Sequence, residues 1–170
     1  MAEKSKLDTI ANIAIIVVCV IASVVLIRNF FFQPRPPGAP PQVEKGERFE
    51  TLQAALPAGA DRTLVLALSP QCGYCTQSMP FYKRLVEERN RKGSNVKVVA
   101  AVGSPQLREA EQAALAQAGV QTDALVEVDF ESIKVPGTPT VLLVDNQGEV
   151  LDVWFGKLEE RDEKKVLASL

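Results

Sequence analysis

Ser69-Pro70-Gln71-Cys72-Gly73-Tyr74-Cys75 is the stretch that decides the fold, because it joins a strand pattern to a helix pattern. The residues from Thr63 to Ser69 are almost all apolar, which is typical of a buried strand in a mostly parallel sheet. The residues from about Gly73 to Arg91 repeat apolar side chains at helical spacing. Cys72 is therefore expected where a helix begins, and Cys75 one turn later on the same helix.

The position of this cysteine pair predicts redox chemistry. A cysteine at a helix N-terminus ionises readily, because free backbone N–H groups and the helix dipole stabilise the thiolate. Thiol–disulfide exchange needs one such thiol to attack a disulfide and a second thiol to resolve the mixed disulfide. We predict that Cys72 is the nucleophile and Cys75 the resolving cysteine. Gly73 and Tyr74 are expected to contact substrate, the glycine by leaving room and the tyrosine as a flat apolar wall.

Other uses of the pair fit the sequence less well. A tetrahedral zinc site needs four ligands, and this chain offers the two motif cysteines and no histidine. A c-type haem site needs histidine directly after the second cysteine, where this chain has Thr76. A purely structural disulfide between Cys72 and Cys75 would close a loop too small to stabilise the fold much. We therefore expect neither a metal nor a cofactor.

Composition narrows the chemistry further. The 170 residues include 19 basic and 21 acidic residues and no histidine. Nearly balanced charge argues against a nucleic-acid surface, so no nucleic-acid partner is expected. The lack of histidine excludes His-based triads, His-ligated metal sites and imidazole acid–base catalysis.

The N-terminal region, residues 1–32, is predicted to be a tail and an uncleaved signal-anchor. Ile10 to Ile27 form an uncharged run of 18 residues, followed by Arg28 and three phenylalanines. About 20 apolar residues cross a bilayer as a helix, and the aromatic residues resemble an interfacial anchor, so residues 10–32 are expected to contact lipid. A buried core helix is the alternative. The basic residues on the two sides of the run give no clear orientation by the positive-inside rule.

A spacer and a domain follow the anchor. Residues 33–43 are predicted to be a proline-rich linker, because Gln33 to Gln42 contain five prolines, which favour extended polyproline II structure. Residues 44–170 have the composition of an α/β domain large enough for its own core.

Within this domain, the sequence predicts alternating strands and helices and a closing hairpin. Trp154 and Phe155, on the last predicted strand, are expected in the core, and a place in the lining of a substrate groove is the alternative. Alternation of this kind gives an α/β/α three-layer sandwich with a mixed sheet. The predicted elements are a weak helix or strand entry at Arg48–Leu56, strands at Thr63–Ser69, Asn95–Gly103 and Ala124–Val128, helices at Gly73–Arg91, Pro105–Gly119 and Glu159–Ser169, and a hairpin of Thr140–Asp145 with Glu149–Phe155.

Several of these motifs together resemble the thioredoxin superfamily. They are the Cys72-Gly73-Tyr74-Cys75 pair, Pro80 in the motif helix, the loop Val135-Pro136-Gly137-Thr138-Pro139-Thr140, and Gly156 after the last strand. The αβ unit between Gly103 and Asp129 resembles the insertion of membrane-anchored TlpA-like and ResA-like members. The resemblance implies a thioredoxin-like fold and a cis bond between Thr138 and Pro139, which places both residues beside Cys72 as substrate-binding residues.

Two positions depart from the thioredoxin pattern. Gln71 stands where thioredoxins have tryptophan, and Leu66 stands where they bury an aspartate that accepts the proton of the second cysteine. A water molecule, Glu127 and Asp129 are the alternatives for this role. The Cys-Gly-Tyr-Cys tetrapeptide with Thr138 before the proline also resembles bacterial disulfide isomerases.

These expectations describe a membrane-anchored thiol–disulfide oxidoreductase that reduces specific protein disulfides. We expect a single-pass protein of the bacterial inner membrane, with its catalytic domain facing the periplasm or the cell exterior. Its expected partners are disulfide-containing proteins and a membrane protein that donates electrons. The alternatives are a disulfide isomerase or oxidase and, in another class, a carrier that binds Cu(I) through two thiols.

Overall fold

The computed structural model describes residues 2–31 and 41–170. The chain separates into two units, Met1–Ala39 and Pro40–Leu170. In the first unit, helix α1 (Ala2–Phe31) contains the uncharged run, and every large apolar side chain described between Ile13 and Leu26 is exposed. No helix in the described part of the chain is long and apolar enough to cross a membrane, so the predicted transmembrane helix is not confirmed. The predicted proline-rich spacer lies largely outside the described residues.

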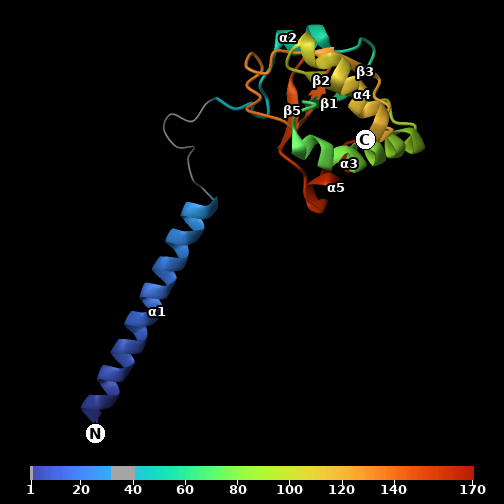
Figure 1. Ribbon diagram of the computed structural model, residues 1–170. Helices are drawn as coiled ribbons and strands as arrows, with labels where there is room; N and C mark the ends of the chain where they lie inside the picture. The colour runs from blue at the N-terminus through green and yellow to red at the C-terminus, as the bar shows by residue number, and fades with distance from the viewer. Residues whose placement is uncertain (1, 32–40) are drawn as a thin grey trace. The chain divides into compact units, whose positions relative to one another are not determined.

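The second unit is an α/β domain whose elements follow the predicted order (Figure 1). The predicted helix Pro105–Gly119 begins as one turn of 3₁₀ helix, and the entry segment forms only a short helix. The elements are α2 (Glu50–Ala55), β1 (Arg62–Leu68), α3 (Gly73–Lys92), β2 (Lys97–Val102), the 3₁₀ turn η1 (Pro105–Leu107), α4 (Arg108–Ala118), β3 (Ala124–Glu127), β4 (Thr140–Asp145), β5 (Val150–Phe155) and α5 (Glu160–Ala168).

The five strands form one mixed sheet in the order β3-β2-β1-β4-β5. Strand β1 is central and pairs in parallel with β2, where Leu66 is opposite Ala100. On its other side β1 pairs antiparallel with β4, where Leu66 is opposite Val141. Strands β4 and β5 form the predicted hairpin, with a register shift between Leu143 and Val144. This is the thioredoxin-like arrangement, and the predicted mixed sheet is confirmed.

The two faces of the sheet are covered unequally. Helices α3, α4 and α5 cover one face and share a core with alternate residues of β1 and β2. The other face is covered by α2 and by residues 126–135, which contain no long helix. The three-layer sandwich is therefore thick on the side that carries the cysteines and thin on the other.

Gly148, at the turn between β4 and β5, allows this turn to pack closely against the segment that contains Phe49. Gly148 has φ of 76°, and a Cβ atom there would lie 2.5 Å from the carbonyl oxygen of Phe49. The backbone also joins these residues, because the Phe49 N–H donates to the Gly148 carbonyl at 3.1 Å. A side chain at this position would need a strained backbone and would separate the two segments.

We expect Gly148→Ala to lower the free energy of unfolding by about 3 kcal/mol, because backbone strain and a steric clash combine. Gly59→Ala is the matched control, since Gly59 has φ of 89° but no atom within 4 Å of the added methyl group. The control should cost about 1 kcal/mol. Urea unfolding of the whole chain, followed by the fluorescence of Trp154, measures both. Equal losses in the two variants would contradict the predicted clash.

Candidate active site

Cys72 and Cys75 lie at the junction of β1 and α3, as the sequence predicts. Cys72 is the N-cap of α3, with φ of −91° and ψ of 107°. The Cys75 backbone N–H donates to the Cys72 sulfur at 3.0 Å. The two sulfurs form a disulfide, with their Cα atoms 5.2 Å apart. Once the disulfide is reduced, the same N–H group can stabilise a Cys72 thiolate.

The two cysteines differ in access to solvent. Cys72 is partly exposed, whereas the exposed fraction of Cys75 is 1%. Cys75 belongs to the core beneath α3, together with Leu66 and Leu68 of β1. An external disulfide can therefore reach the sulfur of Cys72 but not that of Cys75.

The loop before β4 completes the surface around Cys72. The bond between Thr138 and Pro139 is cis, as the resemblance implies. The Thr138 carbonyl oxygen lies 3.2 Å from the Cys72 sulfur, a position in which a reduced thiol can donate a hydrogen bond to it. The Gly156 N–H donates to the Pro139 carbonyl at 2.8 Å, which attaches this loop to the end of β5.

Two exposed aromatic side chains belong to the motif and to the strand that pairs with β4. Tyr74 is 62% exposed and Phe155 is 40% exposed. Among the large apolar side chains described in the Pro40–Leu170 unit, these two alone are exposed. Phe155 pairs with Thr140, two residues after Thr138. A Cβ atom on Gly73 would have no neighbouring atom within 4 Å, and Tyr74 is open to solvent, while substrate contact by these two residues stays a prediction.

The prediction that Phe155 lies in the core is wrong. Trp154 is 8% exposed and does lie in the core, on the face covered by α3. Successive strand residues point to opposite faces, so Phe155 cannot share the environment of Trp154. The thin second layer does not cover this end of β5, which leaves the ring of Phe155 open to solvent.

The acids considered for the Cys75 proton do not lie in its core. Glu127 is exposed and accepts a hydrogen bond from Arg108 at 3.2 Å. Asp129 is exposed and accepts from the Glu131 N–H at 3.1 Å. A third acid, Glu111, is completely buried, and the sequence did not single it out. Its place in the pattern of α4 signals this, because Glu111 stands one turn before the buried Leu115.

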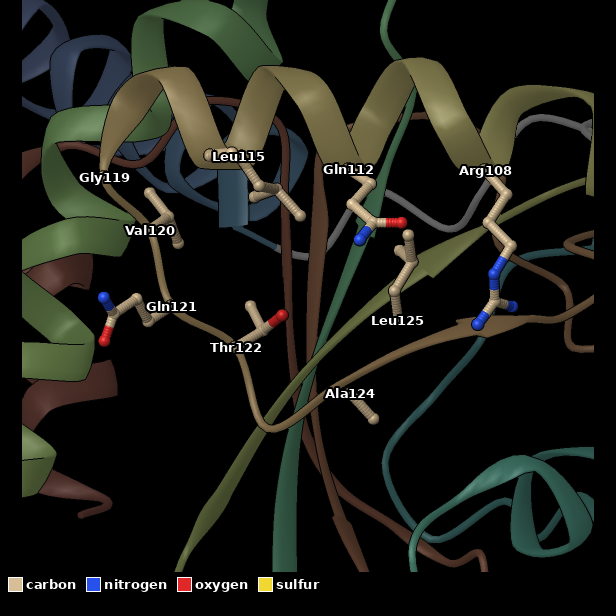
Figure 2. A pocket seen from close by; sticks show the side chains of 10 residues that line it. Arg108, Gln112, Leu115, Gly119, Val120, Gln121, Thr122, Ala124 and Leu125 are labelled. Atoms are coloured by element: carbon tan, nitrogen blue, oxygen red, sulfur yellow. The ribbon is translucent and has the colours of Figure 1, made fainter.

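Two hollows adjoin α4. One, of about 640 Å³, lies between α3 and α4 beside the motif and is lined in part by Pro70, Thr76 and Met79. The other, of about 520 Å³, lies between α4 and β3 (Figure 2). Arg108 and Gln112 point into it from α4, and none of the predicted site residues lines it. The described residues contain no group of three or more Cys, Asp or Glu side chains that could hold a metal ion.

Solved structures with the same fold include a disulfide oxidoreductase and a thiol-disulfide isomerase. StoA from Bacillus subtilis has a TM-score of 0.52 and 16% identity, over 65% of this chain and 84% of StoA. A secreted Mycobacterium tuberculosis disulfide oxidoreductase homologous to Escherichia coli DsbE has a TM-score of 0.51 and 13% identity, over 65% and 82% of the two chains. A thiol-disulfide isomerase from Corynebacterium glutamicum has a TM-score of 0.52 and 16% identity, over 78% and 96%.

No protein-family model and no curated protein matches the chain. The structural similarity therefore establishes a thioredoxin-like fold, and the chain carries a cysteine pair at the junction of β1 and α3 of that fold.

Proposed function

We propose that this protein is a thiol–disulfide oxidoreductase that reduces disulfides of other proteins through Cys72 and Cys75. One observation carries the proposal: a partly exposed cysteine caps a helix and is bonded to a cysteine that is 1% exposed. This difference in access supports Cys72 as the attacking thiol and Cys75 as the resolving thiol.

The reaction proceeds in two exchanges. The Cys72 thiolate attacks one sulfur of the substrate disulfide, a mixed disulfide forms, and the other substrate sulfur leaves as a thiolate. Cys75, after losing its proton, then attacks the Cys72 sulfur. The Cys72–Cys75 bond forms, the second substrate sulfur leaves with the bonding electron pair, and two electrons have passed from the protein to the substrate.

The surroundings of Cys72 support a reductant. Its neighbours in the motif, Gln71, Gly73 and Tyr74, are uncharged, so the thiolate is stabilised mainly by the helix end and by the Cys75 N–H. Moderate stabilisation of the thiolate favours a potential nearer that of thioredoxin, about −270 mV, than that of strongly oxidising DsbA, about −120 mV. Electrons would come from a membrane-bound donor.

Disulfide isomerisation is the second candidate. It is favoured by the combination of Cys-Gly-Tyr-Cys with Thr138 and by the fold shared with the Corynebacterium glutamicum isomerase. The two functions differ in redox potential, because an isomerase works near −180 mV.

The exposed aromatic pair supports proteins as substrates. Aromatic side chains dominate binding at protein interfaces, and both Tyr74, in the motif, and Phe155, which pairs with Thr140, are exposed. We expect Tyr74→Ser and Phe155→Ser each to lower kcat/KM for insulin about tenfold, the effect of losing about 1.4 kcal/mol of binding. Arg161→Ser, an exposed change on α5, is the control.

The same variants should reduce a small disulfide at an unchanged rate, because a small disulfide does not need to contact Tyr74 or Phe155 to reach Cys72. Insulin reduction and reduction of hydroxyethyl disulfide, measured side by side, separate the two effects. Equal losses with both substrates would show that the aromatic residues support the cysteines rather than bind protein.

We also propose that residues 10–32 attach the protein to the bacterial inner membrane, with the domain facing the periplasm or the cell exterior. The uncharged run Ile10–Ile27 and the exposure of its apolar side chains from Ile13 to Leu26 support attachment. The full chain should stay in membranes washed with alkaline carbonate, whereas residues 40–170 should not. Release of the full chain by the wash would refute the attachment.

A further inference from the structure

A buried carboxylate in the structure has no role in the exchange described above. Glu111 on α4 has an exposed fraction of 0%, and neither of its carboxylate oxygens has a hydrogen-bond partner. Among the described residues it is the only acid that is buried. A carboxylate in this setting is costly, because it loses its hydration without gaining a partner. The fold therefore retains a group that weakens it.

The directions of two helices place Glu111 near the end of α3 that carries the cysteines. Strands β1 and β2 are parallel neighbours, and α3 and α4 follow them, pack against each other and cover the same face of the sheet. Both helices therefore start at the same edge of the sheet and run in the same direction.

Contacts between the helices fix their relative register. A Cβ atom on Gly119 would lie 3.8 Å from the outer atoms of the Lys83 side chain, so Gly119 lies within reach of that side chain. About one turn before these residues, Met79 of α3 and Ala114 of α4 line the same hollow. Cys75 lies eight residues before Lys83, and Glu111 lies eight residues before Gly119. With about 1.5 Å of rise per residue in both helices, Glu111 is level with Cys75 to within about one helical turn.

The side chains of both residues face the core between the helices. Leu115, one turn after Glu111 on α4, belongs to the same core cluster as Cys75 and Tyr82. The Tyr82 side chain leans toward the start of α3, as helical side chains do. The Glu111 carboxylate contributes to raising the pKa of Tyr82, after burial as the main cause, so the two groups are near each other.

No other acidic side chain among the described residues is buried, and the remaining buried polar side chains, Thr63, Ser78 and Thr140, carry hydroxyl groups, which are too weakly basic to take a proton from a thiol. The apolar side chains of this core include Leu66, Leu68 and Ala100 of the strands and Val166 of α5. Of the charged groups on the two helices, Arg108 is paired with Glu127 and the Lys83 side chain lies at Gly119, two turns away.

The resolving step requires such an acceptor. Cys75 must become a thiolate before it can attack Cys72, and burial in apolar surroundings opposes its ionisation. We propose that Glu111 accepts the proton of Cys75, an inference that rests on the proposed oxidoreductase function. The proton passes from the Cys75 sulfur to the Glu111 carboxylate as the Cys72–Cys75 bond forms and the substrate thiolate leaves. When the disulfide is reduced again, the carboxyl group returns this proton to the departing Cys75 thiolate.

The direction in which burial moves the pKa of Glu111 in the disulfide state agrees with this cycle. Burial raises the pKa of the Glu111 carboxyl above its ordinary value. At pH values between the ordinary pKa and the raised one, the folded protein holds a proton on Glu111 that the unfolded chain has released. The free energy of unfolding therefore falls as the pH rises through this range. Glu111→Gln removes this loss, so its urea midpoint at pH 8 should exceed that of the wild type.

The two exchange steps can be observed separately when the reduced protein reacts with the disulfide dithiobis(nitrobenzoate). In a Cys19→Ser background, attack by Cys72 releases a first thionitrobenzoate, and resolution by Cys75 releases a second. We expect Glu111→Gln to leave the first phase within twofold of wild type and to slow the second about a hundredfold at pH 7. In this variant the second phase should also rise about tenfold per pH unit, because solvent must then take the proton.

The controls separate this role from a structural one. Glu109→Gln removes the same charge from an exposed position on α4 and should change neither phase. Glu111→Met, which fills the same space, should slow the second phase as glutamine does. An unchanged second phase in the Gln and Met variants, or equal slowing of both phases, would overturn the assignment of Glu111. Failure of the wild type to release a second thionitrobenzoate would instead refute the proposed oxidoreductase function.

Discussion

Replacing Cys72 with serine is expected to abolish insulin reduction, with a loss of at least about 1,000-fold. A serine hydroxyl does not ionise near neutral pH and cannot form a mixed disulfide. The buried Cys75 cannot substitute for it, because its exposed fraction is 1%. The assay is turbidity of insulin with glutathione as the electron donor, in a Cys19→Ser background so that the exposed third thiol does not contribute.

Cys19→Ser alone is the matched control and should retain full activity, since Cys19 belongs to the separate unit that contains α1. Activity that survives in Cys72→Ser would contradict the assignment of the nucleophile. A folded variant should keep its near-ultraviolet spectrum, which excludes unfolding as the cause of the loss.

Replacing Cys75 with serine should trap the mixed disulfide that Cys72 forms with its substrate. Cys72 can still attack, but nothing resolves the product, so a mixed disulfide with the substrate should accumulate to nearly one per protein molecule. In the wild type the intermediate should be scarce. Mass spectrometry of the intact protein under non-reducing conditions, after reaction with oxidised glutathione, measures the occupancy directly.

With Cys19→Ser in every variant, the double variant with Cys72→Ser and Cys75→Ser controls for adducts at other sites and should form none. An adduct that is equally abundant in the wild type would show that Cys75 does not resolve it. An adduct on Cys75 in Cys72→Ser would reverse the assigned roles.

Much of this domain could be predicted from local sequence patterns. Buried parallel strands are continuous apolar runs, so Thr63–Ser69 predicted β1 to within one residue at each end. The runs Thr140–Asp145 and Glu149–Phe155 predicted the hairpin, and the predicted helices Gly73–Arg91 and Pro105–Gly119 end within one residue of α3 and α4. The position of the cysteines at a helix start followed from these boundaries.

Features that depend on packing between distant segments could not be predicted in this way. Phe155 is exposed because the layer over its face of the sheet is thin, which no pattern within β5 reveals. Glu111 is buried because α4 packs beside α3, whereas acidic residues on helices are usually exposed. For α1, hydropathy alone predicted a membrane span that the described residues do not confirm.

The redox potential of the Cys72–Cys75 pair distinguishes a reductant of protein disulfides from an isomerase or an oxidase. Full-length protein in detergent, with Cys19→Ser, is equilibrated with mixtures of reduced and oxidised glutathione, and the dithiol fraction is measured by alkylation and mass spectrometry. A reductant of protein disulfides should have a midpoint near that of thioredoxin, about −270 mV. A midpoint between about −180 and −120 mV, the range of isomerases and oxidases, would contradict the reductase.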